Sequence, residues 1–547
     1  MGRPSETSEE SIVDLKVPCE RQDSGPSQSS DGTAPSRWGL GSGESGASDS
    51  DLVEAMIPAL VERIARMDVL NPEVLRVTPV VGALENFAVA LRVGSAGSFY
   101  QKSHKSQKIS TFWSHSWHGG HWKKIFAIIT LYNGTAAVLL SLLTGACMML
   151  LFGLRTLPGI DRGWLDETVQ WSCWSTFSGF VVASLVMMFW QPRTEVFLDR
   201  ICISQNDDRL KAEAILSLAG LLKKSDRMLI LWDPTWTQRL WCLFELAAFL
   251  KSKTSSQQHL IVRPIFMGPL SIAVYLTFAA FAMPMAVVPL PGFDARTVAQ
   301  LLSAIVFCML VVAVPTVSTI RSYFRDLDTM TLQLSSISVD STRSTCCDTH
   351  HVTPEGGRIL CDRKIVKECV KIWFGSELTF QDTVRAEVLD ILNRNLTQKV
   401  FSTPWALGVT SPIMLAFMDV SVSFAHLGSL WEPWDHNAVA LLLEGLTIWF
   451  LFVPANKDLL ILLIRIGRRR PRSTCLELLK NLSVLAAAAV PALALIVAYG
   501  LTRFTIYVEA AGPGLNAVGF ACCTLLISLC NFLVGLGLKA LLRRPGW

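Results

Sequence analysis

Charged residues are scarce in this chain. Only 17% of its 547 residues are Asp, Glu, Lys or Arg, whereas 51% are hydrophobic and 17 residues are Trp. Soluble globular domains carry about 25% charged residues, so this composition excludes a protein built only of soluble domains and indicates several membrane passes. No repeat of about 20 to 50 residues is visible, which excludes a solenoid or a propeller.

The beginning of the sequence also lacks targeting features. MGRPSETSEE contains no basic stretch followed by an apolar run, so we expect no cleaved secretion signal. Glu6 stands where N-myristoylation requires Ser or Thr, so we do not expect that lipid anchor. Residues 1–50 are rich in Ser, Gly and acids and cannot bury enough surface to offset the entropy of ordering. We predict that this segment is a disordered tail.

Long apolar runs, in contrast, are abundant. A helix that crosses about 30 Å of hydrocarbon needs about 17 to 25 residues, and eight segments meet this requirement. They are residues 125–153, 172–190, 265–288, 297–320, 404–427, 438–454, 482–501 and 514–538, of which the sixth is the shortest. The sequence therefore predicts an α-helical multi-pass membrane protein with about eight spans.

The distribution of basic residues predicts the orientation of these spans. Residues 191–263 contain eleven Lys or Arg and residues 465–481 contain six, whereas the loops of opposite parity contain four in total. Because Lys and Arg remain on the cytoplasmic side, both termini are predicted to be cytoplasmic. None of the 14 Cys lies in a predicted outer loop, which agrees with reduced thiols on the inner side.

The formal net charge of +4 is small, and the basic residues concentrate at the predicted inner face. This pattern predicts the lipid bilayer as a partner, through its acidic headgroups, and no nucleic acid. The most basic stretch is RIGRRRPR, residues 465–472. It is a candidate for binding phosphoinositides, although topological anchoring explains it equally well.

Between the spans, short apolar strands alternate with helices. ISTFWSHSWHGGHW, residues 109–122, predicts a strand, a turn and a helix start. After two spans, residues 194–205 predict a buried strand that ends at Asp199, and an amphipathic helix leads to the strand RMLILW, residues 227–232. A helix over 238–251 and the run HLIVRPIF follow. This alternation predicts a small α/β domain with a parallel sheet, whose first strand is separated from the others by a membrane hairpin.

The predicted organisation has nine parts. They are a disordered tail (1–50), an N-terminal cytosolic segment (51–108), the first part of the α/β domain (109–124), a transmembrane hairpin (125–190), the main part of the α/β domain (191–264), a second hairpin (265–320), a cytosolic helical segment (321–403), a four-span bundle (404–538) and a cytosolic tail (539–547). The N-terminal cytosolic segment is expected to form one amphipathic helix and extended pieces. The helical segment contains DRKIVKECVKIW, a basic amphipathic helix that either lies on the inner leaflet or packs against the α/β domain.

Four stretches of the α/β domain carry a resemblance to a known family. They are SHSW (114–117), FLDRICISQ (197–205), SDRMLILW (225–232) and RLWCLFEL (239–246). They resemble Toll/interleukin-1 receptor (TIR) domains, the related fungal heterokaryon-incompatibility domains and a group of protist multi-pass membrane proteins that carry such a domain. The resemblance implies a TIR-like domain that signals by self-association. The sequence departs from the family because the sheet ends after four strands and a hairpin interrupts the first helix.

The same resemblance implies a catalytic alternative. In TIR domains that cleave NAD, the glutamate of the W-C-x-x-E-L element is catalytic, and Glu245 occupies this position. Ser114, His115, Asp199 and Trp241 are then the candidates for contacting the substrate. A carboxylate could stabilise the positive charge that develops on the ribose as nicotinamide leaves. In the other interpretation, Glu245 pairs with a basic neighbour at the surface and its helix serves only the core.

A second candidate site contains cysteine and histidine. Cys346, Cys347, His350, His351 and Cys361 offer the thiolates and imidazoles that zinc prefers. No pair of C-x-x-C units is present, so the spacing is not that of a usual zinc finger. The alternative is a loop with reduced cytosolic cysteines.

Two acids lie within predicted spans. Counting 1.5 Å per residue places Asp419 and Glu444 both about 10 Å below the outer surface, so the two could meet. Two like charges at low dielectric would retain one proton or hold a cation, which would suit a proton or cation transporter or channel. Alternatively, each acid is hydrogen-bonded within the bundle.

Overall fold

The computed structural model describes residues 55–92, 98–117, 119–164, 167–253, 259–287, 295–335, 338–351, 360–425 and 436–508, and separate positions between 522 and 537. The chain forms two compact units, each built from three pieces of sequence. Unit 1 comprises Met1–His121, Arg193–Arg263 and Thr331–Asn393, and unit 2 comprises Trp122–Pro192, Pro264–Met330 and Arg394–Trp547. The predicted disordered tail, residues 1–50, lies outside the described residues.

Unit 1 contains a six-stranded sheet with the strand order β2-β1-β6-β3-β7-β8. The strands are β1 (Arg76–Pro79), β2 (His104–Lys105), β3 (Ile109–His115), β6 (Glu195–Phe197), β7 (Ser225–Trp232) and β8 (Leu260–Pro264). β3 pairs in parallel with β6, at Thr111↔Val196, and with β7, at Phe112↔Met228. The predicted pairing across the first hairpin is therefore present. β3 is buried along nearly its whole length, as expected for a parallel strand that is covered on both faces.

The order of the strands creates a crevice at one end of the sheet. β3 comes first in the chain among the parallel strands, β6 pairs on one side of it, and β7 pairs on the other. Connections that leave in opposite directions make a topological switch point, where open α/β sheets bind ligands at the carboxyl ends of the strands. Asp199 and Asp233 each follow such a strand end.

Two short strands were not predicted. β1 pairs antiparallel with β6, at Thr78↔Val196, and β2 pairs antiparallel with β1. They come from the segment for which the sequence predicts only extended pieces after a helix. They cover the edge of β6, whose backbone groups would otherwise lack partners on that side.

The helices of unit 1 are mostly short. They include α2 (Ile57–Ala65), α3 (Val80–Ala88), α6 (Asp199–Cys202), α7 (Asp208–Leu216), α8 (Leu218–Lys223), α9 (Leu240–Ser252), α12 (Thr345–Asp348), α13 (Asp362–Phe374) and α14 (Glu377–Thr383). The single amphipathic helix expected after β6 is divided into α7 and α8 at Ser217, whose hydroxyl accepts a hydrogen bond from the Leu70 amide at 3.0 Å. Ten of the 13 residues of α9 are buried, so this helix is apolar on all sides.

The basic amphipathic helix predicted within 321–403 is α13. Its apolar face packs on α2 and α9, and Ile365, Val366 and Cys369 are at most 1% exposed. The Trp373 indole N–H donates to the Ala65 carbonyl at 3.0 Å. The interpretation that this helix packs against the protein is therefore confirmed, because the face that would enter the inner leaflet is already covered.

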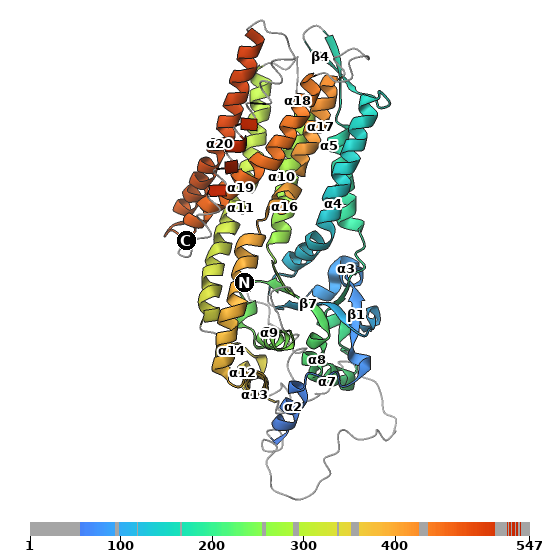
Figure 1. Ribbon diagram of the computed structural model, residues 1–547, viewed down its shortest axis with the longest axis vertical. Helices are drawn as coiled ribbons and strands as arrows, with labels where there is room; N and C mark the ends of the chain where they lie inside the picture. The colour runs from blue at the N-terminus through green and yellow to red at the C-terminus, as the bar shows by residue number, and fades with distance from the viewer. Residues whose placement is uncertain are drawn as a thin grey trace, which may run out of the picture. The chain divides into compact units, whose positions relative to one another are not determined.

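Unit 2 is a bundle of long helices and one β-hairpin (Figure 1). Its elements are α4 (His121–Gly153), β4 (Ile160–Trp164), β5 (Glu167–Trp171), α5 (Trp174–Phe189), α10 (Met267–Val287), α11 (Ala295–Ser335), α16 (Thr403–Val409), α17 (Ser411–Ala425), α18 (His436–Thr447), α19 (Val453–Ile466) and α20 (Thr474–Val508). Met414, Leu415, Met418 and Trp449 form a buried apolar cluster. Gly145 of α4 and Gly179 of α5 both face Leu415, and a Cβ at either position would collide with its side chain. These glycines allow the close helix approach that is common in membrane bundles.

Within the part of unit 2 that the structure describes, three helices are long and apolar enough to cross a membrane: His121–Gly153, Leu441–Ile466 and Thr474–Pro491. A fourth span exists if the pair Thr403–Val409 and Ser411–Ser423, bent by 54°, counts as one. α4 has an inverted polarity, since Leu139, Leu143 and Leu150 are 61 to 62% exposed whereas Asn133 and Ser141 are buried. Apolar outward and polar inward faces are typical of helices surrounded by lipid.

The structure does not confirm all eight predicted spans. The segment 172–190 corresponds to a shorter apolar helix, Trp174–Phe189. The segment 265–288 corresponds to α10, whose 21 residues, Met267–Val287, include the apolar stretch Met267–Met283. Most of the segment 514–538 lies outside the described residues. The sixth segment, 438–454, is not the shortest, because its helix continues to Ile466.

Candidate functional site

Four of the five residues predicted for the TIR-like site converge at the carboxyl end of β3. Ser114 and His115 end this strand, Asp199 begins α6 directly after β6, and Glu245 lies on α9. The Ser114 hydroxyl donates to Glu245 Oε2 at 2.5 Å and accepts from the Trp236 indole N–H at 3.0 Å. Because an indole N–H can only donate, the Ser114 oxygen is the acceptor of the bond from Trp236. Glu245 therefore has an interior partner, and the alternative of pairing with a basic surface neighbour is not what the structure shows.

The two carboxyl groups of this crevice have different charges. Burial, together with the nearby negative charge of Asp199, raises the pKa of Glu245 to about 8, although the Ser114 hydrogen bond lowers it in part. At neutral pH Glu245 therefore retains its proton. Carboxyl groups whose pKa values are separated by their surroundings often divide the roles of acid and base.

Asp199 is the ionised member of the pair. Burial alone would raise its pKa, but the interactions with His115, the Arg200 amide and the Trp117 indole together lower it. The Arg200 amide donates to Asp199 Oδ1 at 2.7 Å, and Trp117 Nε1 donates to Oδ2 at 3.1 Å. His115 Nε2 lies 3.8 Å from Oδ1, and the His115 ring makes no hydrogen bond within the described residues.

The crevice is closed by apolar side chains. The lining residues are Phe112, Trp113, Asp199, Ile203, Ile215, Leu218, Trp241 and Glu245, and they enclose a cavity of about 20 Å³. That volume has room for about one water molecule, whereas small-molecule sites occupy roughly 300 to 1,000 Å³. Trp241 was predicted to contact a substrate, but it is only 7% exposed and donates to Asp362 Oδ2 at 3.2 Å. The structure brings the predicted residues together without leaving space for a dinucleotide.

The sequence did not single out Trp117, Trp236 or Asp362 as members of this site. Trp117 belongs to the quoted SHSW stretch, and Trp236 belongs to the turn after β7. Their role is to donate hydrogen bonds to Asp199 and Ser114, which only the folded chain brings within reach. A tryptophan in a strand-end turn gives too weak a pattern for this role to be predicted.

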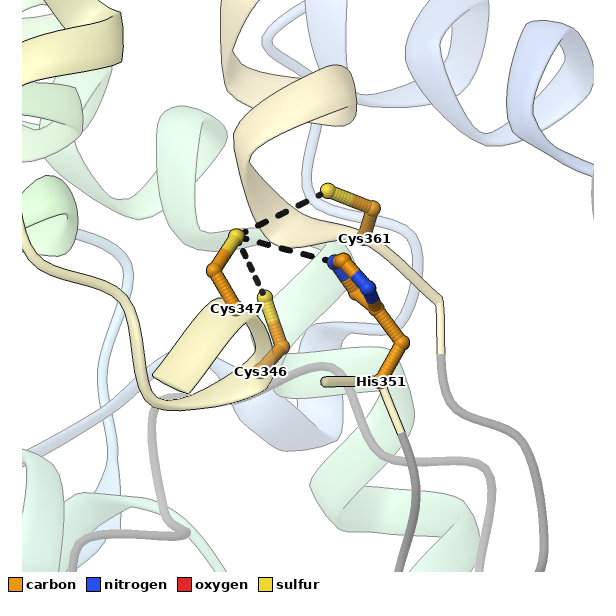
Figure 2. A group of neighbouring side chains, drawn as sticks. All are labelled: Cys346, Cys347, His351 and Cys361. Atoms are coloured by element: carbon orange, nitrogen blue, oxygen red, sulfur yellow. Dashed lines mark hydrogen bonds between the residues drawn. The ribbon is translucent and has the colours of Figure 1, made fainter. Parts of the chain in front are cut away.

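The second candidate site is the cysteine–histidine cluster (Figure 2), which consists of Cys346, Cys347, His351 and Cys361. Cys346 and Cys347 lie on α12, His351 follows it, and Cys361 precedes α13. The four ligand atoms all lie within 4.8 Å of one another. The Cys347 sulfur is 3.8 Å from the Cys346 sulfur, 3.9 Å from the Cys361 sulfur and 3.6 Å from His351 Nε2. Figure 2 shows these side chains turned toward one another.

These separations match tetrahedral coordination. With Zn–S bonds of about 2.3 Å, two sulfur ligands at the tetrahedral angle are about 3.8 Å apart, and a sulfur and an imidazole nitrogen are about 3.6 Å apart. Each of the three separations from Cys347 lies within 0.1 Å of these values. The cluster could therefore hold a metal ion such as zinc.

One of the predicted metal ligands is not in the group. His350 is exposed and does not belong to the cluster, whereas its neighbour His351 does. His350 and His351 both adopt a positive φ, of 54° and 60°. Their amides donate to the carbonyls of Cys347 and Cys346, which turns the chain back over α12. Such strained conformations in non-glycine residues often mark ligand sites.

The thiols of the cluster differ in acidity. The hydrogen bond with Cys346 lowers the pKa of Cys361 to about 4, with further help from the Lys364 amide and His351, although burial opposes this shift. The same hydrogen bond and burial raise the pKa of Cys346. The lowered pKa of Cys361 favours its thiolate, the form of cysteine that binds metals.

The two acids that were predicted to lie within spans both belong to unit 2, Asp419 on α17 and Glu444 on α18. Asp419 is fully buried and accepts hydrogen bonds from the Ser172 hydroxyl at 2.7 Å, the Ser175 amide at 2.9 Å and the Thr176 amide at 2.8 Å. These contacts cap the first turn of α5, where a carboxylate is favoured by the free amides and the helix dipole. The interpretation of Asp419 as an acid hydrogen-bonded within the bundle therefore holds. Glu444 is 2% exposed on α18.

Comparisons with known proteins do not add a family. No family model, curated protein or solved structure matches the chain. The class is therefore defined by the fold and the sites: a protein with candidate membrane spans and a parallel-rich α/β unit that carries a cluster able to hold a metal ion.

Proposed function

We propose that this protein is an integral membrane protein whose cytosolic α/β unit is stabilised by a zinc ion and acts as a TIR-like signalling or self-association module. The observation that supports a non-catalytic role is the closed crevice at Glu245, which leaves only about 20 Å³. A module that works by association needs a stable surface and no substrate cavity. The predicted orientation, with both termini cytoplasmic, places this module on the inner side of the membrane.

The zinc ion would serve as a structural link. Closed sites with four protein ligands are typical of structural zinc. Cys361 directly precedes α13, and α13 packs on both α2 and α9. The adjacent Arg343 amide donates to the Gln238 carbonyl at 2.7 Å, and its carbonyl accepts from the Leu240 amide at 3.1 Å. An ion at the cluster would therefore fix α12 and α13 against the start of the helix that carries Glu245.

Metal analysis tests the zinc site. The full-length protein is purified in detergent, and its metal content is measured by mass spectrometry before and after dialysis against a chelator. We expect about one zinc per chain, and we expect the variant Cys347→Ser to lose it. The matched control is Cys475→Ser, which replaces an exposed cysteine outside the cluster. A protein that folds normally and binds no zinc would contradict this part of the proposal.

The association state tests the module itself. Full-length protein in lipid nanodiscs or detergent is examined by chemical cross-linking over a range of concentrations. We expect oligomers in the unmodified protein and in Glu245→Gln, because association does not use this carboxyl group. A protein that stays monomeric at every concentration, also after tethering to vesicles at high density, would contradict self-association.

NAD cleavage through Glu245 is the second candidate function. The observation that favours it is the position of Glu245 at the switch point of the sheet, hydrogen-bonded to Ser114. Stabilising positive charge on ribose requires the ionised carboxylate. With a pKa of about 8, that form increases as the pH rises. An enzyme of this kind would therefore release nicotinamide faster at pH 9 than at pH 7.

The assay for this candidate uses full-length protein clustered on vesicles and incubated with NAD. Release that disappears in Glu245→Gln and persists in Glu368→Gln, a half-exposed glutamate on α13, would establish the enzyme. Absence of nicotinamide release from the unmodified protein between pH 7 and 9 would eliminate it. The crevice would also have to open, because its present volume cannot admit the substrate.

A further inference from the structure

A larger, polar pocket lies in unit 2. It has a volume of about 420 Å³ and is lined by Lys123, Ser318, Thr319, Ser322, Arg325, Arg470 and Glu477. The lining residues come from the first turn of α4, from α11, from the link between α19 and α20, and from the start of α20. The volume lies within the range of roughly 300 to 1,000 Å³ that is typical of small-molecule sites.

The wall of this pocket is held by a buried arginine, Arg321. Its side chain is 0% exposed and donates to the carbonyls of Gly467 at 2.9 Å and Arg469 at 3.0 Å, and to Asn481 Oδ1 at 2.6 Å. Arg321 also forms an ion pair with Glu477 at 2.9 Å. A buried cation is stable only with such a complete set of partners. Arg321 therefore holds the link between α19 and α20, residues 467–473, against α11 and α20.

This arrangement leaves an excess of positive charge in the pocket. Glu477 is its one lining acid, and the charge of Glu477 is already matched by Arg321, which does not line the pocket. Arg325 forms a longer ion pair with Glu477, at 3.7 Å, and Asp326, outside the described lining, interacts electrostatically with Arg325 and Lys123. Lys123 and Arg470 are exposed and add two further cations. Among the described lining residues, three cations therefore face one carboxylate that has a closer partner.

Hydroxyl groups complete the lining. Ser318 and Ser322 are four residues apart on α11, so they lie on one face of the helix. Thr319 uses its hydroxyl proton to donate to the Pro315 carbonyl at 2.8 Å. Cations and hydroxyl donors around one volume form the usual environment of a bound phosphate group.

The position of the pocket relates it to a membrane surface. Lys123 lies at the start of the candidate span His121–Gly153. Arg470 lies between the end of the span Leu441–Ile466 and the start of the span Thr474–Pro491. The ends of membrane spans lie at the level of the lipid headgroups.

We propose that this pocket binds a ligand with phosphate monoester groups, at the level of the headgroups of inositol phospholipids. The Lys123, Arg325 and Arg470 side chains supply the charge, and Ser318 and Ser322 supply hydrogen bonds. A headgroup with several phosphates fits the pocket better than a single carboxylate or phosphodiester, because three cations surround it. The same chemistry is present in a free inositol phosphate, so the experiment has to distinguish the two sources.

Lipid retention by the full-length protein tests this proposal. Detergent-purified protein is incubated with phosphatidylinositol 4,5-bisphosphate or with phosphatidylserine, and the retained lipid is measured by native mass spectrometry. We expect preferential retention of the inositol lipid. Each of the variants Lys123→Ala and Arg470→Ala is expected to weaken it about fivefold, which is the effect of one cation near a charged surface. The matched control is Arg472→Ala, an exposed arginine of the same link that does not line the pocket.

Soluble inositol trisphosphate and inorganic phosphate form the second arm. If inositol trisphosphate displaces the inositol lipid with equal affinity, the pocket is supported with the soluble compound as its ligand. If inositol trisphosphate displaces the lipid only weakly, the pocket is supported with the lipid as its ligand. Equal retention of phosphatidylserine, or equal loss in the Arg470→Ala and Arg472→Ala variants, would overturn the proposal, because both indicate only general surface charge. Thermal unfolding followed by tryptophan fluorescence shows whether each variant is folded.

Discussion

The cysteine–histidine cluster and the Glu245 crevice both bring ionisable side chains together in unit 1. They differ in whether a ligand has room between those side chains. In the cluster, the Cys347 sulfur lies at the separation that a tetrahedral ion requires from each of the other three ligand atoms. In the crevice, Ser114 already satisfies Glu245, the Arg200 amide and Trp117 satisfy Asp199, and apolar side chains fill the remaining space. Proximity of reactive groups is therefore not enough to define a site. A shared centre with room for a ligand is the better criterion.

The largest effect that would test this comparison is expected at Cys347. If the cluster holds an ion, the variant Cys347→Ser removes the ligand that contacts all the others, and the folded state loses the stabilisation of binding. An ion present at about 1,000 times its dissociation constant contributes about 4 kcal/mol. Thermal unfolding of the full-length protein, with and without a chelator, measures the change. Identical unfolding of Cys347→Ser and of the unmodified protein would remove the distinction between the two sites.

The next effect concerns Glu245 and depends on pH. Because its pKa is raised to about 8 in the folded state, its ionisation destabilises that state. The stability that the protonated form provides is complete below the unfolded pKa of about 4.3 and is lost as the pH rises through about 8. We expect Glu245→Gln to change the free energy of unfolding little at pH 5. At pH 9 we expect the variant to be more stable than the unmodified protein by a few kcal/mol.

Denaturant unfolding at these two pH values measures the difference. The control is Glu368→Gln, whose side chain is 47% exposed, and it should show little pH-dependent difference. If the free energies of unfolding of Glu245→Gln and of the unmodified protein change with pH in parallel, Glu245 is ionised at neutral pH. The crevice would then resemble a catalytic site more than a closed core.

A smaller effect is expected when Ser114 is replaced. The variant Ser114→Ala leaves the buried indole N–H of Trp236 without its acceptor and removes the partner of Glu245. An unsatisfied buried donor costs about 1 to 3 kcal/mol. Ser106→Ala is the control, because the Ser106 hydroxyl bonds the Lys108 carbonyl in an exposed loop. Equal stabilities of the two variants would show that the crevice is not held by this hydrogen bond.

The smallest effect is expected at His350. The variant His350→Asn keeps a residue type that accepts a positive φ, and the side chain is exposed outside the cluster. Stability should change by less than about 0.5 kcal/mol, and the zinc content should be unchanged. His351→Asn should reduce zinc affinity strongly in the same measurement. A loss of zinc in His350→Asn would show that the two histidines exchange roles.

The sequence predicts the centre of the sheet but not its edge. β3, β6 and β7 are apolar runs bounded by turns and helices, so their type and pairing follow from local pattern. β1 and β2 have four and two residues, which is too short for any periodicity to be visible. β1 forms because the edge of β6 offers backbone partners, and β2 pairs with β1 in turn. Both are tertiary effects.

The candidate sites show the same limit. Cys346, Cys347 and Cys361 are close in sequence, so their residue types predict a metal site, but the choice of His351 over His350 depends on how the chain turns back over α12. The position of Glu245 was predicted by resemblance. The closure of its crevice depends on the packing of side chains from α7, α8 and α9, and no local pattern specifies a volume. The cap that Asp419 makes on α5 joins residues more than 240 positions apart.

The interruption of the sheet by helices also constrains how the protein is made. β3 is synthesised before both of its parallel partners, and Val196 and Met228 follow 85 and 116 residues later, as counted from Thr111 and Phe112. A ribosome that has completed the first helical hairpin therefore presents a central strand with both edges bare. Such a strand is exposed to wrong pairing until its neighbours emerge. Biogenesis of this protein should consequently depend on chaperones that act beside the insertion machinery, and chains truncated before residue 225 should aggregate or be degraded.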